Sequence, residues 1–203
     1  MTAVQAHGEF YEDLNTREYT GFGKKEYDAL KGKGGYTSSM DIVKGLHSDK
    51  NRSVKTAKGN KVDCGDILKR MNEKEYDVVV GQWRQKGDNK IFHTEYIFNI
   101  TPEDCDKLWG SMKYELVEEY DTFIKSIPHG KEAQQATKVE RTSRKKILAD
   151  KNALMVIHPK VDSKKQRRVQ CSFKIDKLIA SGVKYTKKDS NSEGYSPKRK
   201  IKT

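Results

Sequence analysis

The chain has 203 residues and a formal net charge of +12, from 41 basic and 29 acidic residues. It contains no apolar run long enough to span a bilayer, and its first residues lack the basic and apolar regions of a signal peptide, so we expect neither a membrane protein nor a secreted one. The three cysteines have no zinc-binding spacing, and reduced thiols in a cytoplasmic, intracellular protein are expected.

The positive charge is concentrated in the last third of the chain. From residue 131 onward there are 21 Lys and Arg against 7 Asp and Glu, whereas the first 130 residues hold 20 basic and 22 acidic side chains. A segment this basic is suited to a polyanionic partner. It contains no Trp, which a membrane-surface helix would use beside its lysines, so the composition favours nucleic acid over a membrane.

The first hundred residues predict two helices and two strand pairs. In chain order we expect a helix at 3–14, a loop at 16–36 that can include one short helix, a hairpin at 40–56, a helix at 62–76, and a strand pair at 76–85 and 91–100. In the second helix, Asp63 fits the N-cap position, and Ile67, Leu68 and Met71 form an apolar stripe. The segment 86–90 has the composition of a hairpin turn.

The second half begins with a clear helix start, because Thr101 can cap and Pro102 occupies the first helical position. This helix is predicted to run to about Lys125, with Trp109 in the core rather than in a dimer interface, and to end before Pro128. The remaining elements are a basic helix at 131–150, a buried strand at 153–157, a turn at 158–166, a strand at 167–175, and a polar, flexible tail after 184.

This order of elements predicts a mixed α/β fold, with a central sheet flanked by helices and a basic C-terminal helix and strand pair. We expect a single domain over residues 1–185. Its core would span about 1–127 and its basic, DNA-contacting part about 128–185, followed by a flexible tail at 186–203.

The hairpin at 40–56 places a carboxylate on one arm, Asp41, and an ammonium group on the other, Lys55. Such a pair is either an exposed ion pair or part of a metal-dependent site for phosphodiester hydrolysis. Magnesium is held by one or two carboxylates together with water and substrate phosphate, and a nearby lysine can orient the attacking water and offset developing charge. Both functions can therefore be supplied by one hairpin.

The chain has a helix, then Asp on a first strand, a short turn, x-Val-Lys-Thr on a second strand, and a second helix. This order resembles the core of PD-(D/E)XK nucleases, a group that contains many type II restriction endonucleases. The motif's aspartate would be Asp41 and its lysine Lys55, while Ser53 stands where Asp or Glu is usual. The resemblance covers roughly residues 1–100. It implies a restriction-endonuclease-like core, Mg²⁺ as cofactor, and catalysis by Asp41, Ser53 and Lys55.

A subgroup of these enzymes has Ser-x-Lys, and the missing carboxylate comes from the following helix. Asp66, in the first turn of the predicted helix, would then be the second metal-binding and catalytic acid beside Asp41. Asp63 fits a helix cap better, and Glu73 lies two turns further along the helix. If Asp66 points elsewhere, one of these two residues or an acid of the first helix, which carries Glu9 and Glu12, must replace it.

The strand at 167–175 alternates, with an apolar side opposite a polar side that can read base edges. Several basic residues of the preceding turn and helix can contact phosphates. The predicted DNA-binding residues are Arg141, Arg144, Lys145, Lys164, Lys165, Arg167, Arg168, Gln170, Ser172 and Lys174.

Together these patterns predict a Mg²⁺-dependent, site-specific endonuclease for double-stranded DNA, of the type II restriction kind. We expect it to act as a homodimer, because cutting both strands of a palindrome needs two sites related by a twofold axis. The alternative is a non-catalytic, basic DNA-binding protein, for which the hairpin is only scaffold.

Overall fold

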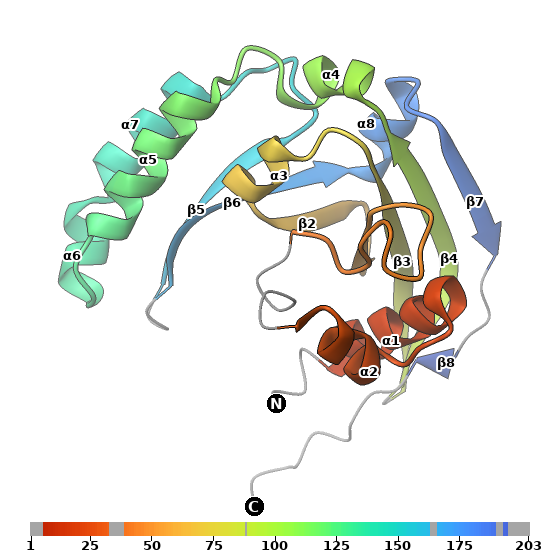
Figure 1. The fold of residues 1–203 in the computed structure, drawn as a ribbon. Coiled ribbons are helices and arrows are strands. Elements are labelled where there is room, and N and C mark those ends of the chain that lie inside the picture. The colour runs from red at the N-terminus through yellow and green to blue at the C-terminus, as the bar shows by residue number, and fades with distance from the viewer. Residues whose placement is uncertain (1–5, 33–38, 88, 163–165, 190–192, 195–203) are drawn as a thin grey trace, which may run out of the picture. The chain divides into compact units, whose positions relative to one another are not determined.

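The computed structural model describes residues 6–32, 39–87, 89–162, 166–189 and 193–194 (Figure 1). The predicted mixed α/β class is confirmed, since helices accompany two sheets. The chain forms two compact units that alternate along the sequence. Unit 1 contains the described residues of Met1–Val62, Glu75–Ile100 and Val183–Thr203, and unit 2 those of Asp63–Lys74 and Thr101–Gly182. These boundaries differ from the expected division near residue 128.

Unit 1 is built on one sheet with two N-terminal helices. Its sheet has the strand order β1-β3-β4-β7, with β1 parallel to β3, the other neighbours antiparallel, and β8 paired with β4. The elements are α1 (Ala6–Thr20), α2 (Lys24–Leu30), β1 (Arg52–Ala57), β3 (Tyr76–Lys86), β4 (Asn89–Ile100), β7 (Tyr185–Asp189) and β8 (Glu193–Gly194). Helix α1 lies against the sheet beside β1 (Figure 1).

The close approach of α1 to the sheet depends on a glycine in β3. The ring of Tyr11 on α1 lies so near Gly81 that a Cβ there would be 2.5 Å from the Tyr11 Cζ atom. Tyr11 joins Ile42, Val54 and Val79 in the buried core of the unit. The missing side chain of Gly81 therefore fixes where α1, and every acid it carries, can sit on the sheet.

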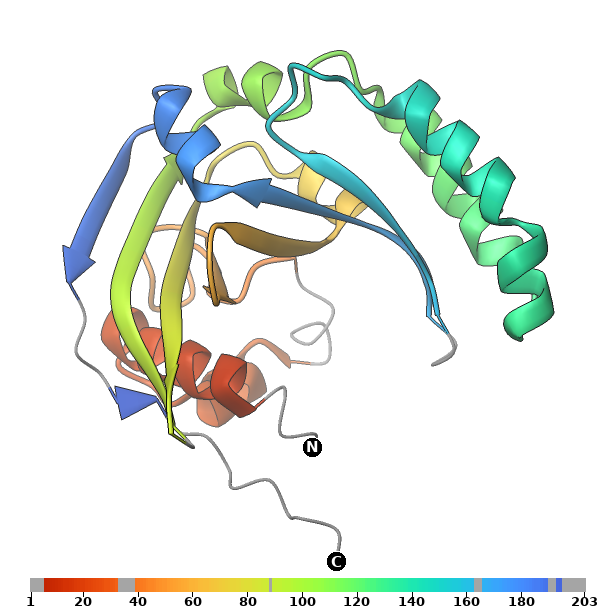
Figure 2. The same cartoon turned by 180° about the vertical axis from the view of Figure 1, so that it is seen from behind.

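Unit 2 contains a three-stranded sheet of order β2-β6-β5 and the remaining helices. The elements are β2 (Lys61–Asp66, whose first two residues belong to unit 1), α3 (Ile67–Asn72), the 3-10 turn Pro102–Asp104, α4 (Cys105–Trp109), α5 (Tyr114–Ser126), α6 (Lys131–Ala136), α7 (Lys138–Leu148), β5 (Val156–Val161), β6 (Arg167–Lys174) and α8 (Ile175–Ala180). Helix α5 packs on β6, where buried Asp121 accepts a hydrogen bond from the Val169 amide at 2.8 Å. Helices α5 and α7 lie side by side and run in opposite directions (Figures 1 and 2).

Two predicted helices are wrong in their extent. The segment expected as a helix from residue 62 begins as strand β2. Val62 and Cys64 are buried while Asp63 between them is exposed, and this alternation of burial is typical of a strand. Helix α3 starts only at Ile67, with Asp66 rather than Asp63 as its cap. The predicted basic helix at 131–150 is divided at Thr137 into α6 and α7.

The predicted helix from Thr101 starts as expected but does not run on to Lys125. Thr101 and Asp104 form the capping arrangement, and Trp109 is buried, which confirms its place in the core. The helix ends at Gly110, whose φ of 55° suits glycine. The Asp150 carboxylate lies where a side chain at residue 110 would be, and it accepts a hydrogen bond from the Ser111 amide at 2.7 Å.

The C-terminal third holds three further corrections. The strand expected at 153–157 starts at Val156 and continues to Val161, so residues 158–161 of the predicted turn are strand that pairs with β6. Helix α8 was not predicted. Residues 186–189 were expected in the flexible tail but belong to β7. All residues of β7 are exposed, so the sequence has no alternation of buried and exposed residues that would predict a strand here. The strand is formed by its pairing with β4. The tail residues 190–192 and 195–203 lie outside the described part of the chain.

Candidate functional site

The candidate site of unit 1 lies where residue 41 meets the start of β1. The first arm of the predicted hairpin is a single bridge rather than a strand, in which Ile42 pairs with Arg52. The Asp41 and Ile42 amides both donate to the Arg52 carbonyl, at 2.9 and 3.0 Å. This short pairing is enough to fix the backbone of Asp41 beside the strand that carries Lys55.

Three of the four expected catalytic residues converge here. One carboxylate oxygen of Asp41, Oδ2, accepts hydrogen bonds from Lys55 Nζ at 2.9 Å, from the Val54 amide at 2.6 Å and from Ser53 Oγ at 3.3 Å. Lys55 Nζ also donates to the Val54 carbonyl at 2.9 Å. The ammonium group of Lys55 is thus held between two acceptor oxygen atoms, one from the Asp41 carboxylate and one from the Val54 carbonyl.

Asp66, the fourth expected residue, has another structural role. It belongs to unit 2, where its side chain caps α3 by accepting from the Lys69 amide at 3.1 Å. Asp63 and Glu73 also belong to unit 2. Within unit 1 the second carboxylate near Asp41 therefore comes from the first helix.

That carboxylate is Glu12 of α1. Burial, and then the negative charge of Asp41, raise the pKa of Glu12, while Lys24 and Lys55 act in the opposite direction. Glu12 Oε1 is 3.0 Å from Lys24 Nζ. The negative charge of Asp41 thus acts on Glu12, so the two carboxylates lie in one region of unit 1.

Helix α2 holds this region in place through four side chains. Lys24 bridges Glu12 and Asp28, its distance to Asp28 Oδ2 being 2.6 Å. Lys31 pairs with Asp28 Oδ1 at 2.8 Å and donates to the backbone carbonyl of Asp41 at 2.9 Å. The hydroxyl of buried Tyr27 accepts from the Val43 amide at 2.9 Å. The backbone is therefore tied to α2 and its C-terminal cap at the Asp41 carbonyl and at the Val43 amide.

The oxygen atoms of this region are of the kind that hold hard cations. Among the residues that the structure describes, no group of three or more His, Cys, Asp or Glu side chains lies so as to hold a metal ion. Asp41, Glu12 and the Val54 carbonyl offer two carboxylates and one neutral oxygen. Magnesium is commonly held by one or two carboxylates and completes its shell with water and phosphate.

Two other acids of unit 1, Asp77 and Glu95, have structural partners. Buried Asp77 accepts from Asn99 Nδ2 at 2.9 Å and lies 3.6 Å from Arg52 Nε. Glu95 accepts a hydrogen bond from the Tyr11 hydroxyl. Burial, and then this contact with Glu95, raise the pKa of Tyr11 far above its usual range. The pair therefore anchors α1 to β4.

The predicted nucleic-acid surface is only partly assembled as expected. On the ribbon of β5 and β6, Lys160 stands opposite Arg168 and His158 opposite Gln170. Ser172 was expected to face outward, but it is only 2% exposed and is 2.7 Å from His158 Nε2, so this expectation is wrong. Lys174 is exposed at the end of β6.

Several predicted arginines are engaged within unit 2. Arg167 donates to the carbonyls of Ile127 and Pro128 at 3.0 and 2.7 Å. Arg141 donates to the Gln134 carbonyl at 2.6 Å, and Arg144 binds Glu140 at 2.6 Å while lying over the ring of Phe123. Lys145 is partly exposed. Lys164 and Lys165 lie outside the described residues.

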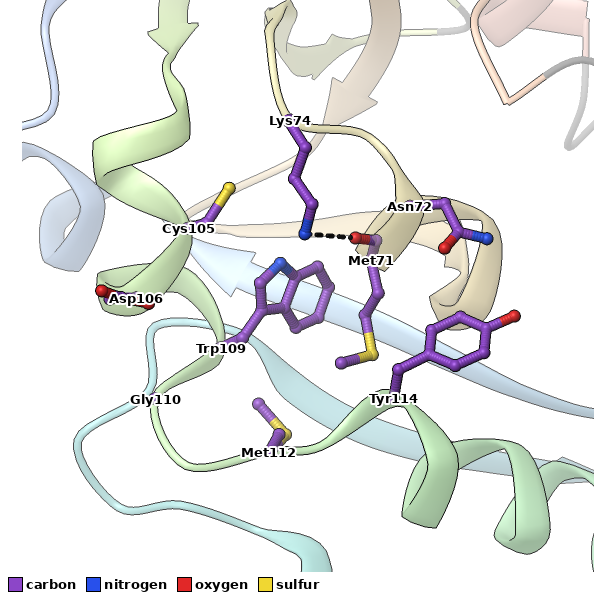
Figure 3. A pocket seen from close by; sticks show the side chains of 9 residues that line it. All are labelled: Met71, Asn72, Lys74, Cys105, Asp106, Trp109, Gly110, Met112 and Tyr114. Carbon is purple, nitrogen blue, oxygen red and sulfur yellow. Dashed lines mark hydrogen bonds between the residues drawn. The ribbon is translucent and has the colours of Figure 1, made fainter.

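A cavity of about 260 Å³ in unit 2 is lined by Met71, Asn72, Lys74, Cys105, Asp106, Trp109, Gly110, Met112 and Tyr114 (Figure 3). Lys74 Nζ donates to the Met71 carbonyl at 3.1 Å. Burial raises the pKa of the Cys105 thiol, against the opposite effect of Lys74. The cysteine is therefore protonated near neutral pH, and it is a poor nucleophile.

No helix in the described ranges combines the length and the apolar composition that a membrane span requires. No family model matches the chain, and no curated protein or solved structure is significantly similar to it.

Proposed function

We propose that the protein is a magnesium-dependent endonuclease that hydrolyses phosphodiester bonds of double-stranded DNA, in the manner of a type II restriction enzyme. The observation that carries this proposal is the contact of Lys55 with Asp41 at 2.9 Å, beside the carboxylate of Glu12. The order of elements supports it in part, since a helix, α3, follows the strand that carries Lys55, with β2 between them.

In this proposal Asp41, Glu12 and the Val54 carbonyl hold the magnesium ion. When bound, the ion would polarise the scissile phosphate and lower the pKa of a water molecule. Lys55 would orient the attacking water and offset the negative charge that develops on the phosphate. Glu12 takes the role that the sequence assigned to Asp66, and the absence of a carboxylate at Ser53 is thereby compensated from α1.

The DNA contact is proposed on the ribbon of β5 and β6. Like charges directly opposite each other destabilise a sheet, and Lys160 and Arg168 form such a pair. A phosphate backbone would relieve this repulsion, and binding of this kind weakens steeply as salt rises.

The test is cleavage of plasmid DNA with magnesium by wild type and by matched variants. Asp41→Ala, Lys55→Ala and Glu12→Gln are each expected to lower the rate at least ~100-fold. Asp66→Asn should cleave like wild type, because Asn caps a helix as well as Asp. If Asp66→Asn is inactive while Glu12→Gln is active, the second carboxylate is Asp66, as the sequence first indicated.

A second candidate, a DNA-binding protein without catalysis, is favoured by the same Lys160–Arg168 pair. It predicts plasmid that stays intact with magnesium while salt-sensitive binding is retained. That result would refute the endonuclease, and discrete magnesium-dependent fragments abolished by Asp41→Ala and Lys55→Ala would refute the alternative.

A further inference from the structure

The cavity of about 260 Å³ in unit 2 is lined by a buried hydrogen-bond donor, the indole of Trp109 (Figure 3). Trp109 is only 5% exposed, and its Nε1 atom has no hydrogen-bond partner among the residues that the structure describes. An indole nitrogen can donate a hydrogen bond but cannot accept one. Because a buried donor without a partner costs free energy, this N–H group calls for an acceptor.

The ammonium group of Lys74 is a second donor at this cavity. It donates to the Met71 carbonyl at 3.1 Å, and an ammonium group carries three N–H bonds, so donors are left for a ligand. In Figure 3 the indole nitrogen of Trp109 is on the side of its ring that points toward Lys74, while the carboxylate of Asp106 points away from both. Lys74 is exposed, so a ligand can reach this end from solvent. Positive charge and two donors therefore mark this end of the cavity.

The other end of the cavity is apolar. The side chains of Met71 and Met112 are buried and lie below the Trp109 ring in Figure 3, on the side away from Lys74. Thioether side chains are flexible and adapt to the shape of an apolar group. The volume is just below the roughly 300 Å³ at which sites for drug-sized ligands begin, so the cavity suits a smaller molecule.

Backbone hydrogen bonds fix the wall that carries the indole. Helix α4, which ends at Trp109, is joined to the segment before β5: the Leu154 amide donates to the Lys107 carbonyl and the Met155 amide to the Leu108 carbonyl, each at 3.0 Å. The indole N–H is therefore presented from a held element rather than from a free loop. Binding to a site that is already ordered costs less conformational entropy, which favours a small ligand.

We propose that this cavity binds a small organic carboxylate. The carboxylate accepts hydrogen bonds from Trp109 Nε1 and Lys74 Nζ, and the apolar body of the ligand lies against Met71 and Met112. A carboxylate supplies both the acceptors and the negative charge that an ammonium group favours. A neutral carbonyl would leave that charge unmatched, and an inorganic anion would leave the methionines without an apolar partner. The inference does not rest on the proposed function, since the proposed catalytic residues belong to unit 1.

The first test is titration of the full-length, ¹⁵N-labelled protein with benzoate, followed by nuclear magnetic resonance. The chain has two tryptophans, so two indole N–H signals are expected, and the variant Trp83→Phe assigns them. The Trp109 signal should shift in a saturable way, because its N–H gains an acceptor, while the Trp83 signal stays in place. A Trp109 signal that benzoate does not move would overturn the proposal.

A comparison of ligands tests the two ends of the cavity separately. Acetate and inorganic phosphate carry negative charge without a large apolar body, and benzamide has the ring of benzoate without its charge. Each should bind at least about tenfold more weakly than benzoate, because burial of the ring and the charged hydrogen bonds both contribute. Phosphate or acetate that binds as tightly as benzoate would overturn the proposal, as would benzamide that does so.

Matched variants identify the two donors by calorimetry with benzoate. Lys74→Met and Trp109→Phe should each raise the dissociation constant about tenfold or more, because each removes one hydrogen bond to the carboxylate. The controls make the same changes elsewhere: Lys146→Met at an exposed lysine of α7, and Trp83→Phe in unit 1. Both should bind benzoate like wild type, and circular dichroism checks that every variant is folded. Benzoate affinity that Lys74→Met leaves unchanged, or that Lys146→Met lowers equally, would overturn the proposal even if Trp109→Phe fails to fold.

Discussion

Lys31, at the end of α2, donates a hydrogen bond from Nζ to the backbone carbonyl of Asp41 at 2.9 Å. Its side chain is only 6% exposed, and its charge is matched by Asp28 at 2.8 Å. A buried lysine of this kind fixes its acceptor, because leaving the ammonium group unpaired would be costly. The position of Asp41 beside Lys55 is therefore set from two directions, by β1 and by α2.

Lys31→Met keeps most of the apolar stem and removes the ammonium group. We expect a loss of about 1–3 kcal/mol in the free energy of unfolding, because the Asp41 carbonyl and Asp28 both lose a partner. Urea unfolding measures this. Lys25→Met is the matched control, since Lys25 lies on the same helix but is exposed. Equal effects of the two substitutions would show that Lys31 does not hold Asp41 in place.

Gly81→Ala tests how α1 is seated on the sheet. The new Cβ would lie 2.5 Å from Tyr11 Cζ, so α1 must shift. We expect about 1–3 kcal/mol of destabilisation in urea unfolding, as for other overpacked sites, together with a loss of any magnesium affinity that depends on Glu12. Gly59→Ala is the control, because a Cβ at Gly59 has no neighbour within 4 Å. If folded Gly81→Ala binds magnesium with unchanged affinity, Glu12 is not a ligand of the metal.

The parts of this fold that could be predicted are those that depend on residues close together in the sequence. The apolar run of β3, the alternation of Val169, Cys171 and Phe173 in β6, and the cap at Thr101 each act within a few residues, and each is found. The interruption at Gly110 is different in kind. It depends on Asp150, forty residues away, whose carboxylate occupies the space beside the glycine.

The candidate site shows the same division. The pairing of Asp41 with Lys55 was anticipated because both flank one short turn. Asp66 was assigned to the metal on the assumption of a longer helix, but pairing of β2 with β6 extends the strand and turns Asp66 into a cap. The proximity of Glu12 to Asp41 depends on the packing of α1, which no local pattern of the sequence indicates.

The raised pKa of Glu12 has a consequence for magnesium binding. Its ordinary value is 4.5, and burial and Asp41 raise it in the folded protein. From about pH 4.5 up to the raised pKa, the folded protein keeps a proton that the unfolded chain has lost, so this group's contribution to stability falls as pH rises through that window. A bound cation favours the ionised carboxylate and must displace that proton.

We therefore expect magnesium affinity to rise with pH from about 4.5 up to the raised pKa of Glu12, with protons released on binding within that window. Calorimetry in buffers of different ionisation enthalpy measures the protons released. Glu12→Gln should lose both the release and the pH dependence, while Asp66→Asn should keep them. Binding that is independent of pH in the wild type would contradict the role of Glu12.

The ribbon of β5 and β6 offers a prediction in which stability and DNA binding change in opposite directions. Lys160 and Arg168 are direct cross-strand neighbours of like charge. Lys160→Glu would replace repulsion with an ion pair and should stabilise the fold by about 0.2–1 kcal/mol. It should also weaken DNA binding and make the dependence of affinity on salt less steep, since fewer phosphates are neutralised.

Lys151→Glu makes the same charge change at an exposed position before β5 and serves as the control. Fluorescence anisotropy with a DNA duplex over a range of salt, and urea unfolding of the same samples, provide the two measurements. If Lys160→Glu and Lys151→Glu weaken binding equally, only total charge matters and the ribbon is not the DNA contact.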